Sequence, residues 1–181
     1  MEPDRVLTFS PVHHPDPKVQ RAGFDLRDPY VEQCWTPVVG PSATLLLRRF
    51  PTLWVERTPA RLHAKELSRS LGIGEGTGPN SRLSATMDRL VRFGLARARG
   101  AGDDFEVYLE VNPLRPRQLA RLPEWTRTTH EHLLAEHIRS LSRTETPQGN
   151  LSALNDRPDG LEHDVPRTGH PSIGRQQALG R

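Results

Sequence analysis

The sequence contains very little cysteine, because Cys34 is the only one in 181 residues. A disulfide within the chain needs two cysteines and a cysteine-based zinc site needs several, so the composition excludes both. No apolar run approaches the roughly 20 residues of a membrane-spanning helix, and the first residues lack the apolar segment of a secretory signal. We therefore expect a cytoplasmic protein without membrane contact.

Catalytic and metal-binding patterns are also missing. No serine elbow, paired carboxylates or triad-like set occurs, and Cys34 lies in an apolar run typical of packing. The stretch GIGEGTG, residues 72–78, follows an expected helix and contains no Gly-Lys-Ser/Thr, which favours a flexible loop over a nucleotide site. His130, His132 and His137 have no cysteine or further well-placed ligand near them. We therefore expect neither an enzyme nor a bound metal or cofactor.

Apolar residues are scarce and unevenly spread. They make up 34% of the chain, which also contains 17 prolines. Most of the Leu, Val and Phe residues fall within 42–141, so one modest core is expected, and the apolar piece 28–42 should lie extended against it. We predict a largely flexible arm over 1–40, a folded domain over 41–125, a C-terminal helix over 126–143 and a disordered tail over 144–181.

The positive charge is concentrated in the middle of the chain. The formal net charge is only +3, but residues 57–99 hold nine basic and three acidic residues, a local net charge of +6. Residues 1–40 carry six acidic against four basic residues. A local excess of this kind is the electrostatic footprint expected of a surface that binds a polyanion.

The same middle region predicts a regular succession of elements. Ser42 is a plausible N-cap for a first helix that Pro51 should bend or end. A short strand at 60–63, a helix at 64–71 and a helix at 81–93 follow, the last two ended by glycine. The segments LARAR and FEVYLEV then alternate like two strands joined by GAGDD, which is typical of a hairpin.

The helix over 81–93 has two contrasting faces. At about 100° per residue, its apolar side chains form one stripe that should face the core: Leu83, Met87, Leu90 and Val91. The opposite face carries three arginines and one small residue: Arg82, Ala85, Arg89 and Arg92. A small residue lets a helix backbone approach a groove floor, and the arginines around it reach phosphates or guanine edges.

A family resemblance follows from these segments. The run HAKELSRSLGI…SRLSATMDRLVRFGLARARG…DDFEVYLEV, His63–Val111, resembles the winged helix-turn-helix domain of bacterial transcription regulators. The part Leu83–Ala96 is similar to their recognition helix passing into the first wing strand. The resemblance covers about 42–125 and implies an α+β, mostly helical fold, with a three-helix core, a two-stranded wing and an extra C-terminal helix.

The resemblance also implies a role for each element. Helix 64–71 would cross the backbone of double-stranded DNA, helix 81–93 would enter the major groove, and the wing 95–111 would lie on the flanking backbone or minor groove. The implied DNA-binding residues are Lys65, Arg69, Ser81, Arg82, Ala85, Arg89, Arg92, Arg97 and Arg99. Two features depart from the family pattern: the loop 72–80 is long, and Asp103 and Asp104 at the wing tip would repel phosphate.

We thus expect a DNA-binding transcription regulator that acts without a cofactor. Two alternatives stay open: a winged helix that serves as a protein-protein interaction module, and a DNA-binding protein of plasmid or phage replication or partition. The C-terminal helix carries an apolar stripe that fits either the core or an oligomer seam: Leu133, Leu134, His137, Ile138 and Leu141. A homodimer through this helix is therefore also predicted.

Overall fold

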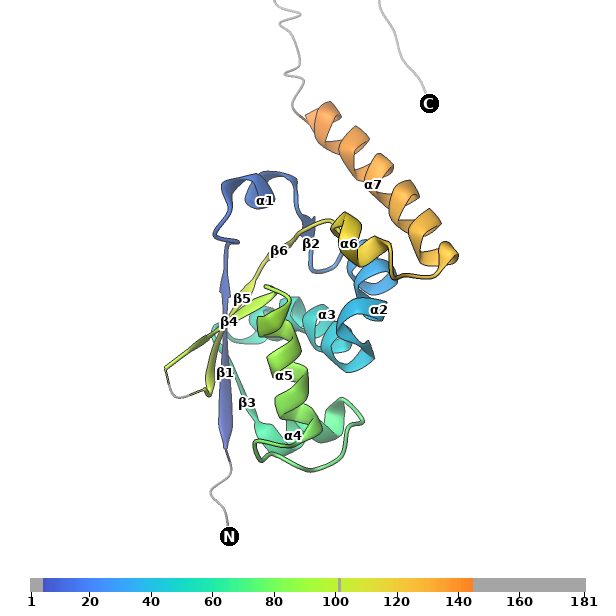
Figure 1. Ribbon diagram of the computed structural model, residues 1–181. Coiled ribbons are helices and arrows are strands. Elements are labelled where there is room, and N and C mark those ends of the chain that lie inside the picture. Colours follow the sequence, from blue (N-terminus) through green and yellow to red (C-terminus); the bar gives the residue numbers. More distant parts are fainter. Residues whose placement is uncertain (1–4, 101, 145–181) are drawn as a thin grey trace, which may run out of the picture. The chain divides into compact units, whose positions relative to one another are not determined.

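The computed structural model describes residues 5–100 and 102–144 (Figure 1). Within them the chain is an α+β protein with more helix than strand, as the sequence predicts. The tail predicted to be disordered lies outside the described residues from residue 145 onward. No helix in the described part is both long and apolar enough to cross a membrane.

The main sheet combines the N-terminal segment with strands from the middle of the chain. Its strands, in the order β3-β1-β5-β4, are β3 (Ala60–His63), β1 (Val6–Val12), β5 (Asp104–Tyr108) and β4 (Ala96–Arg99). Strand β1 runs antiparallel to β3 and parallel to β5, and β4 and β5 form the predicted antiparallel hairpin. Beyond β5 the chain continues into β6 (Glu110–Val111), which pairs with β2 (Phe24–Asp25) in a separate two-stranded sheet.

The prediction of a flexible arm over 1–40 is wrong for its described part, residues 5–40. Leu7 and Phe9 in β1 are almost completely buried, and their alternation with polar residues is the short strand signal that the surrounding prolines and histidines obscure. The Phe9 ring lies 4.9 Å from that of Phe50 and 5.6 Å from that of Phe105. The arm therefore supplies the centre of the core.

The segment 28–42 is helical rather than extended. After α1 (Pro17–Ala22) and β2, the chain forms a π-helix, η1 (Val31–Trp35), and a short helix, α2 (Thr36–Val39). Its apolar side chains enter the core as helical faces, and Cys34 is fully buried among them, in agreement with the predicted packing role. Burial and the nearby Asp28 carboxylate raise the pKa of the Cys34 thiol to about 11.

Three helices lie on the same side of the main sheet (Figure 1). They are α3 (Pro41–Glu56), α4 (Ala64–Ser70) and α5 (Arg82–Arg92). Helix α3 begins one residue before the predicted cap and continues through Pro51 instead of ending there. Ser81 caps α5 by accepting a hydrogen bond from the Ser84 backbone N–H at 3.1 Å, and Gly94 with φ 69° follows its end.

The C-terminal helix, α7 (Glu124–Thr144), follows the short helix α6 (Pro116–Leu119) and is attached to the body through aromatic contacts. The Tyr30 hydroxyl accepts a hydrogen bond from the Leu114 N–H at 2.8 Å and lies 2.6 Å from Nδ1 of the buried His130. Further along α7, the His137 ring stacks on Phe24 at 4.2 Å. These contacts hold the helix against the N-terminal segments.

The predicted stripe of α7 is divided between two environments. Leu133 and Leu134 pack against the core, while Ile138 is 53% exposed. Trp125, near the start of the same helix, is also exposed. The core interpretation of the stripe therefore holds for Leu133, Leu134 and His137, while Ile138 faces outward.

Candidate nucleic-acid interface

The buried face of helix α5 is close to the face that its sequence predicts. Leu83, Met87 and Leu90 are buried, but the fourth position of the stripe is Thr86, and Val91 is 37% exposed. On the helical wheel Thr86 and Val91 lie about 60° and 80° to either side of Leu83, so the buried stripe is centred slightly toward Thr86. The threonine hydroxyl is satisfied by donating to the Arg82 carbonyl at 2.8 Å.

The opposite face of α5 is open and basic. Arg82, Ala85, Arg89 and Arg92 are all exposed, as predicted. In the part of the chain that the structure describes, none of these three arginines has a carboxylate within ion-pair distance. Two of them occupy the last turn of the helix, where positive charge also stabilises the helix dipole.

Arg89 lies over the loop that joins α2 and α3. A Cβ atom added at Gly40 would come within 2.7 Å of Nη1 of Arg89, and Gly40 has a φ of 88°. The absence of a side chain at Gly40 therefore leaves room for the guanidinium beside the backbone. Arg89 reaches along the molecular surface rather than straight away from it.

The basic residues of α4 are paired with the loop that follows it. Glu75 lies 3.1 Å from Nζ of Lys65 and 3.6 Å from Nε of Arg69. The hydrogen bond from Lys65, together with the two positive charges, lowers the pKa of the Glu75 carboxyl. The glycine-rich loop thus folds back over α4, and one carboxylate serves both of the predicted DNA-binding residues.

The basic residues of the hairpin are paired in the same manner. Arg97 faces Glu106 in the strand register, donates from Nε at 2.9 Å and makes a second, short contact through Nη2. Arg99 places Nη1 3.0 Å from the other oxygen of the same carboxylate. The Glu106 side chain is only 9% exposed, whereas both arginines remain about two-thirds exposed. The group therefore presents one net positive charge to solvent.

The negative charge of the hairpin tip is compensated by Arg5, which is not among the predicted DNA-binding residues. Nε of Arg5 lies 2.5 Å from the Asp103 carboxylate, and its guanidinium also donates to the carbonyls of Gly102 and Thr77. Arg5 thereby connects the tip of the hairpin to the loop between α4 and α5. The repulsion expected from Asp103 is offset, while Asp104 has no such partner among the described residues.

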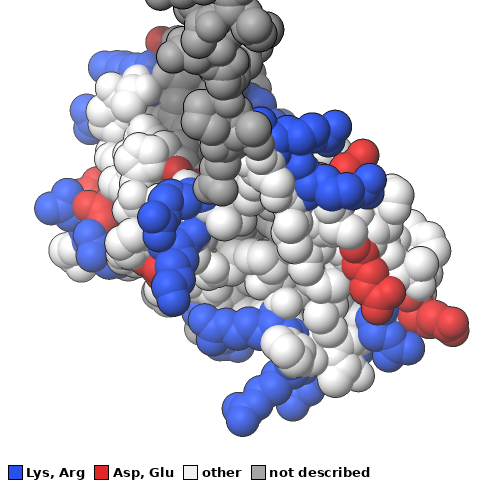
Figure 2. Space-filling view, turned by 90° about the horizontal axis from the view of Figure 1, so that it is seen from above, with Lys and Arg blue, Asp and Glu red and all other residues white. Residues whose placement is uncertain are grey.

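The surface as a whole is basic but interrupted. The face seen in Figure 2 carries Lys and Arg side chains on several sides of a largely uncharged area, with acidic side chains between them. Near α5, the positive charge is reduced by Glu75, which pairs with Lys65 and Arg69, and by Glu106, which pairs with Arg97 and Arg99. Of the predicted site residues, those on α5 form the part of the interface without an internal partner.

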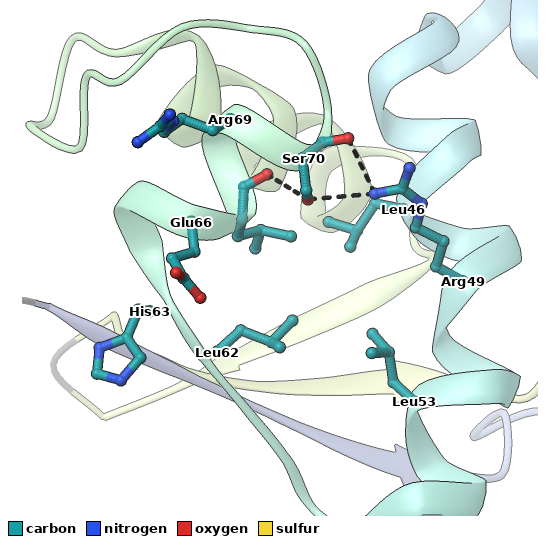
Figure 3. A pocket seen from close by; sticks show the side chains of 9 residues that line it. Leu46, Arg49, Leu53, Leu62, His63, Glu66, Arg69 and Ser70 are labelled. Atoms are coloured by element: carbon teal, nitrogen blue, oxygen red, sulfur yellow. Dashed lines mark hydrogen bonds between the residues drawn. The ribbon is translucent and has the colours of Figure 1, made fainter.

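A hollow lies beside the interface, between α3, β3 and α4. It has a volume of about 380 Å³ and apolar walls that include Leu46, Leu53 and Leu62 (Figure 3). Arg49 crosses its rim to donate to both the carbonyl and the hydroxyl of Ser70. Arg69 also lines the hollow, although its guanidinium points away from it in Figure 3, so the hollow borders one of the predicted DNA-binding residues.

Two of the three histidines of α7 pack against aromatic side chains. His130 and His137 contact Tyr30 and Phe24, and His132 lies 3.9 Å from Glu136 on the same helix. Over 5–100 and 102–144, no group of three or more His, Cys, Asp or Glu side chains is placed to hold a metal ion.

Comparison with known proteins adds no assignment. No protein-family model, curated protein or solved structure matches the chain.

Proposed function

We propose that the chain is a DNA-binding protein of the winged helix class that regulates transcription, with α5 as its recognition helix. The succession α3, β3, α4, α5, β4, β5 is the order of helices and strands in that class. The sheet differs, because β1 lies between β3 and β5. The β4–β5 hairpin nevertheless remains at the sheet edge beside α5, where a wing is required.

The observation that carries this proposal is the exposed face of α5. Arg82, Arg89 and Arg92 surround Ala85 and have no ion-pair partner among the described residues, so their charges are available to phosphates. Neutralising phosphates releases counterions, and binding should weaken with salt by about 0.9 in log K per log salt for each contact. An arginine that pairs with guanine would add about 1–3 kcal/mol of discrimination.

The proposal is tested with a triple variant of the recognition helix, Arg82→Gln, Arg89→Gln and Arg92→Gln. Binding of a mixed-sequence DNA duplex is measured across a salt gradient for the full chain. We expect strong, salt-dependent binding by the wild type and a slope smaller by about 2.7 for the variant.

A matched control removes the same charge elsewhere. Arg127, Arg139 and Arg143 are exposed on α7, and replacing all three by Gln leaves α5 intact. This control should keep most of the wild-type affinity. Equal losses for the two triple variants, or a wild type indifferent to salt, would contradict the proposal.

A protein-interaction module is the second candidate, because Glu75 and Glu106 reduce the positive charge on both sides of α5. In that case the α5 variant would lose a protein partner and the wild type would not bind DNA. A role in plasmid or phage replication would use the same contacts and differ in the sites selected from random oligonucleotides.

The homodimer through α7 stays a prediction. The apolar side chains that such a dimer would cover are Ile138 and Trp125, both exposed in the single chain. A two-fold dimer would read two inverted half-sites about one or two helical turns apart.

A further inference from the structure

A groove at the C-terminal end of α5 extends the basic surface away from the hairpin. It has a volume of about 730 Å³ and lies between the end of α5, Trp35 of η1 and the segment 112–118. Three arginines line it, Arg92, Arg115 and Arg117, and no Asp or Glu does. Arg92 therefore belongs both to the exposed face of α5 and to this groove.

The arginines of the groove form no ion pair with a carboxylate of the described residues. Arg115 and Arg117 are exposed, and within the described residues neither has a carboxylate at ion-pair distance. The hairpin contrasts with this, because Glu106 holds both Arg97 and Arg99. Beside α5, the arginines without an ion-pair partner among the described residues thus include those of the segment before and within α6, whereas the sequence predicts the hairpin arginines for this role.

The backbone that carries these arginines is anchored before any ligand arrives. Trp35 donates from Nε1 to the carbonyl of Asn112 at 3.0 Å, and the Leu114 N–H donates to the buried Tyr30 hydroxyl. The Gln118 side chain accepts from the Arg115 N–H at 2.8 Å. A preformed site loses less conformational entropy on binding.

We propose that this groove binds the phosphodiester backbone of duplex DNA that flanks the site read by α5. The inference rests on the proposed function, because the groove shares Arg92 with the recognition helix. Three positive charges in a groove whose lining contains no Asp or Glu match a polyanion, and the apolar walls from Phe93 and Pro113 suit the sugar faces between phosphates. The flanking contact then comes from the segment before α6 instead of the hairpin.

The test is a double variant, Arg115→Gln with Arg117→Gln, in the full chain. Its binding to a mixed-sequence duplex is titrated with salt beside the wild type. We expect the log-log slope to fall by about 1.8 and the affinity to fall about thirtyfold at about 0.15 M salt. The control is Arg127→Gln with Arg139→Gln on α7, which should leave both quantities near the wild type.

The outcomes separate this inference from the proposed function. If the α5 triple variant loses binding while Arg115→Gln with Arg117→Gln keeps the wild-type slope, the groove assignment is overturned and the proposed function stands. If the wild type binds no duplex, both are overturned. Retention of an acidic peptide such as polyglutamate that depends on Arg115 and Arg117, without their affecting DNA binding, would assign the groove to a protein partner and overturn the inference. Thermal unfolding of each variant confirms that it is folded.

Discussion

Two glutamates decide which of the basic side chains are available for binding. Glu75 holds Lys65 and Arg69, and Glu106 holds Arg97 and Arg99. Ion pairs on the surface are weak, so a strong polyanion can compete for their cations, but each carboxylate remains nearby as a repelling charge. Position in an element is therefore a poor guide to availability unless the nearest carboxylate is known.

Under the proposed function, replacing Glu75 by Gln should strengthen DNA binding. The substitution removes the carboxylate that pairs Lys65 and Arg69, so both become free to contact phosphates. We expect a several-fold higher affinity and a salt slope steeper by up to about 1.8, measured by titration of a mixed-sequence duplex.

Glu66→Gln provides the control for this substitution. Glu66 is an exposed residue of α4, and its replacement changes the net charge equally. No ion pair joins it to Lys65 or Arg69, so it should leave the slope nearly unchanged. Equal effects of the two variants would show that net charge alone matters and that the pairing at Glu75 does not limit binding.

At the scale of elements, α7 is held by ring contacts whose strength depends on protonation. Burial lowers the pKa of His130 below its ordinary value of 6.5, against a smaller opposing effect of the Glu131 charge. With its proton on Nε2, the neutral ring accepts the hydroxyl hydrogen of Tyr30 at Nδ1, and the other partner of that hydroxyl is the Leu114 N–H. A proton on His130 would remove that acceptor inside the packed site.

Acidification should therefore weaken the fold through His130. Because the pKa is lower in the folded state, the unfolded chain binds more protons near pH 6, and the free energy of unfolding falls as the pH drops below about 6.5. Above that pH the contribution is fully present. His130→Gln keeps an acceptor for Tyr30 but does not titrate, so urea unfolding between about pH 7 and pH 5 should give a flatter curve for this variant.

The exposed His132 allows a matched comparison. His132→Gln replaces an exposed imidazole on the same helix without touching Tyr30, and its curve should run parallel to that of the wild type. Parallel curves for His130→Gln and the wild type would instead show that His130 does not contribute to the acid sensitivity.

The elements near α5 could be predicted because their signals are local. Periodicity and caps place the strand 60–63 and the helix ends at Ser81 and Gly94 within a residue or so of the structure. The partners of the charges could not be predicted in this way, since Glu75 reaches Lys65 only through the path of its loop. Arg115 and Arg117 were missed because their proline-rich segment reads as a turn, with no periodic face to examine.

At the scale of the whole molecule, the sheet depends on its earliest strand. Strand β1 pairs with β3 on one side and β5 on the other, so it joins two parts of the chain that a winged helix would pair directly. Amino-acid composition does not reveal a short strand with two buried residues. Its stability comes from partners far away in the sequence, which no local pattern reveals.

Phe9→Ala should test this dependence. Phe9 is fully buried against Phe50 and Phe105, and truncating a buried phenylalanine costs about 3–5 kcal/mol through lost contacts and the cavity left behind. We expect a large drop in the urea midpoint. Val55→Ala, at a position 80% exposed, should change stability by no more than about 0.5 kcal/mol. A small effect at Phe9 would mean that the arm is dispensable.

The place of β1 in the sheet also affects how the chain is made. On the ribosome, Phe9 emerges long before Phe105. Strand β1 therefore remains unpaired on its β5 side until most of the domain has been synthesised. Pairing between distant segments is slow, and an exposed apolar strand is prone to self-association in the meantime. A chaperone that shelters the nascent N-terminal segment should therefore raise the yield of native protein.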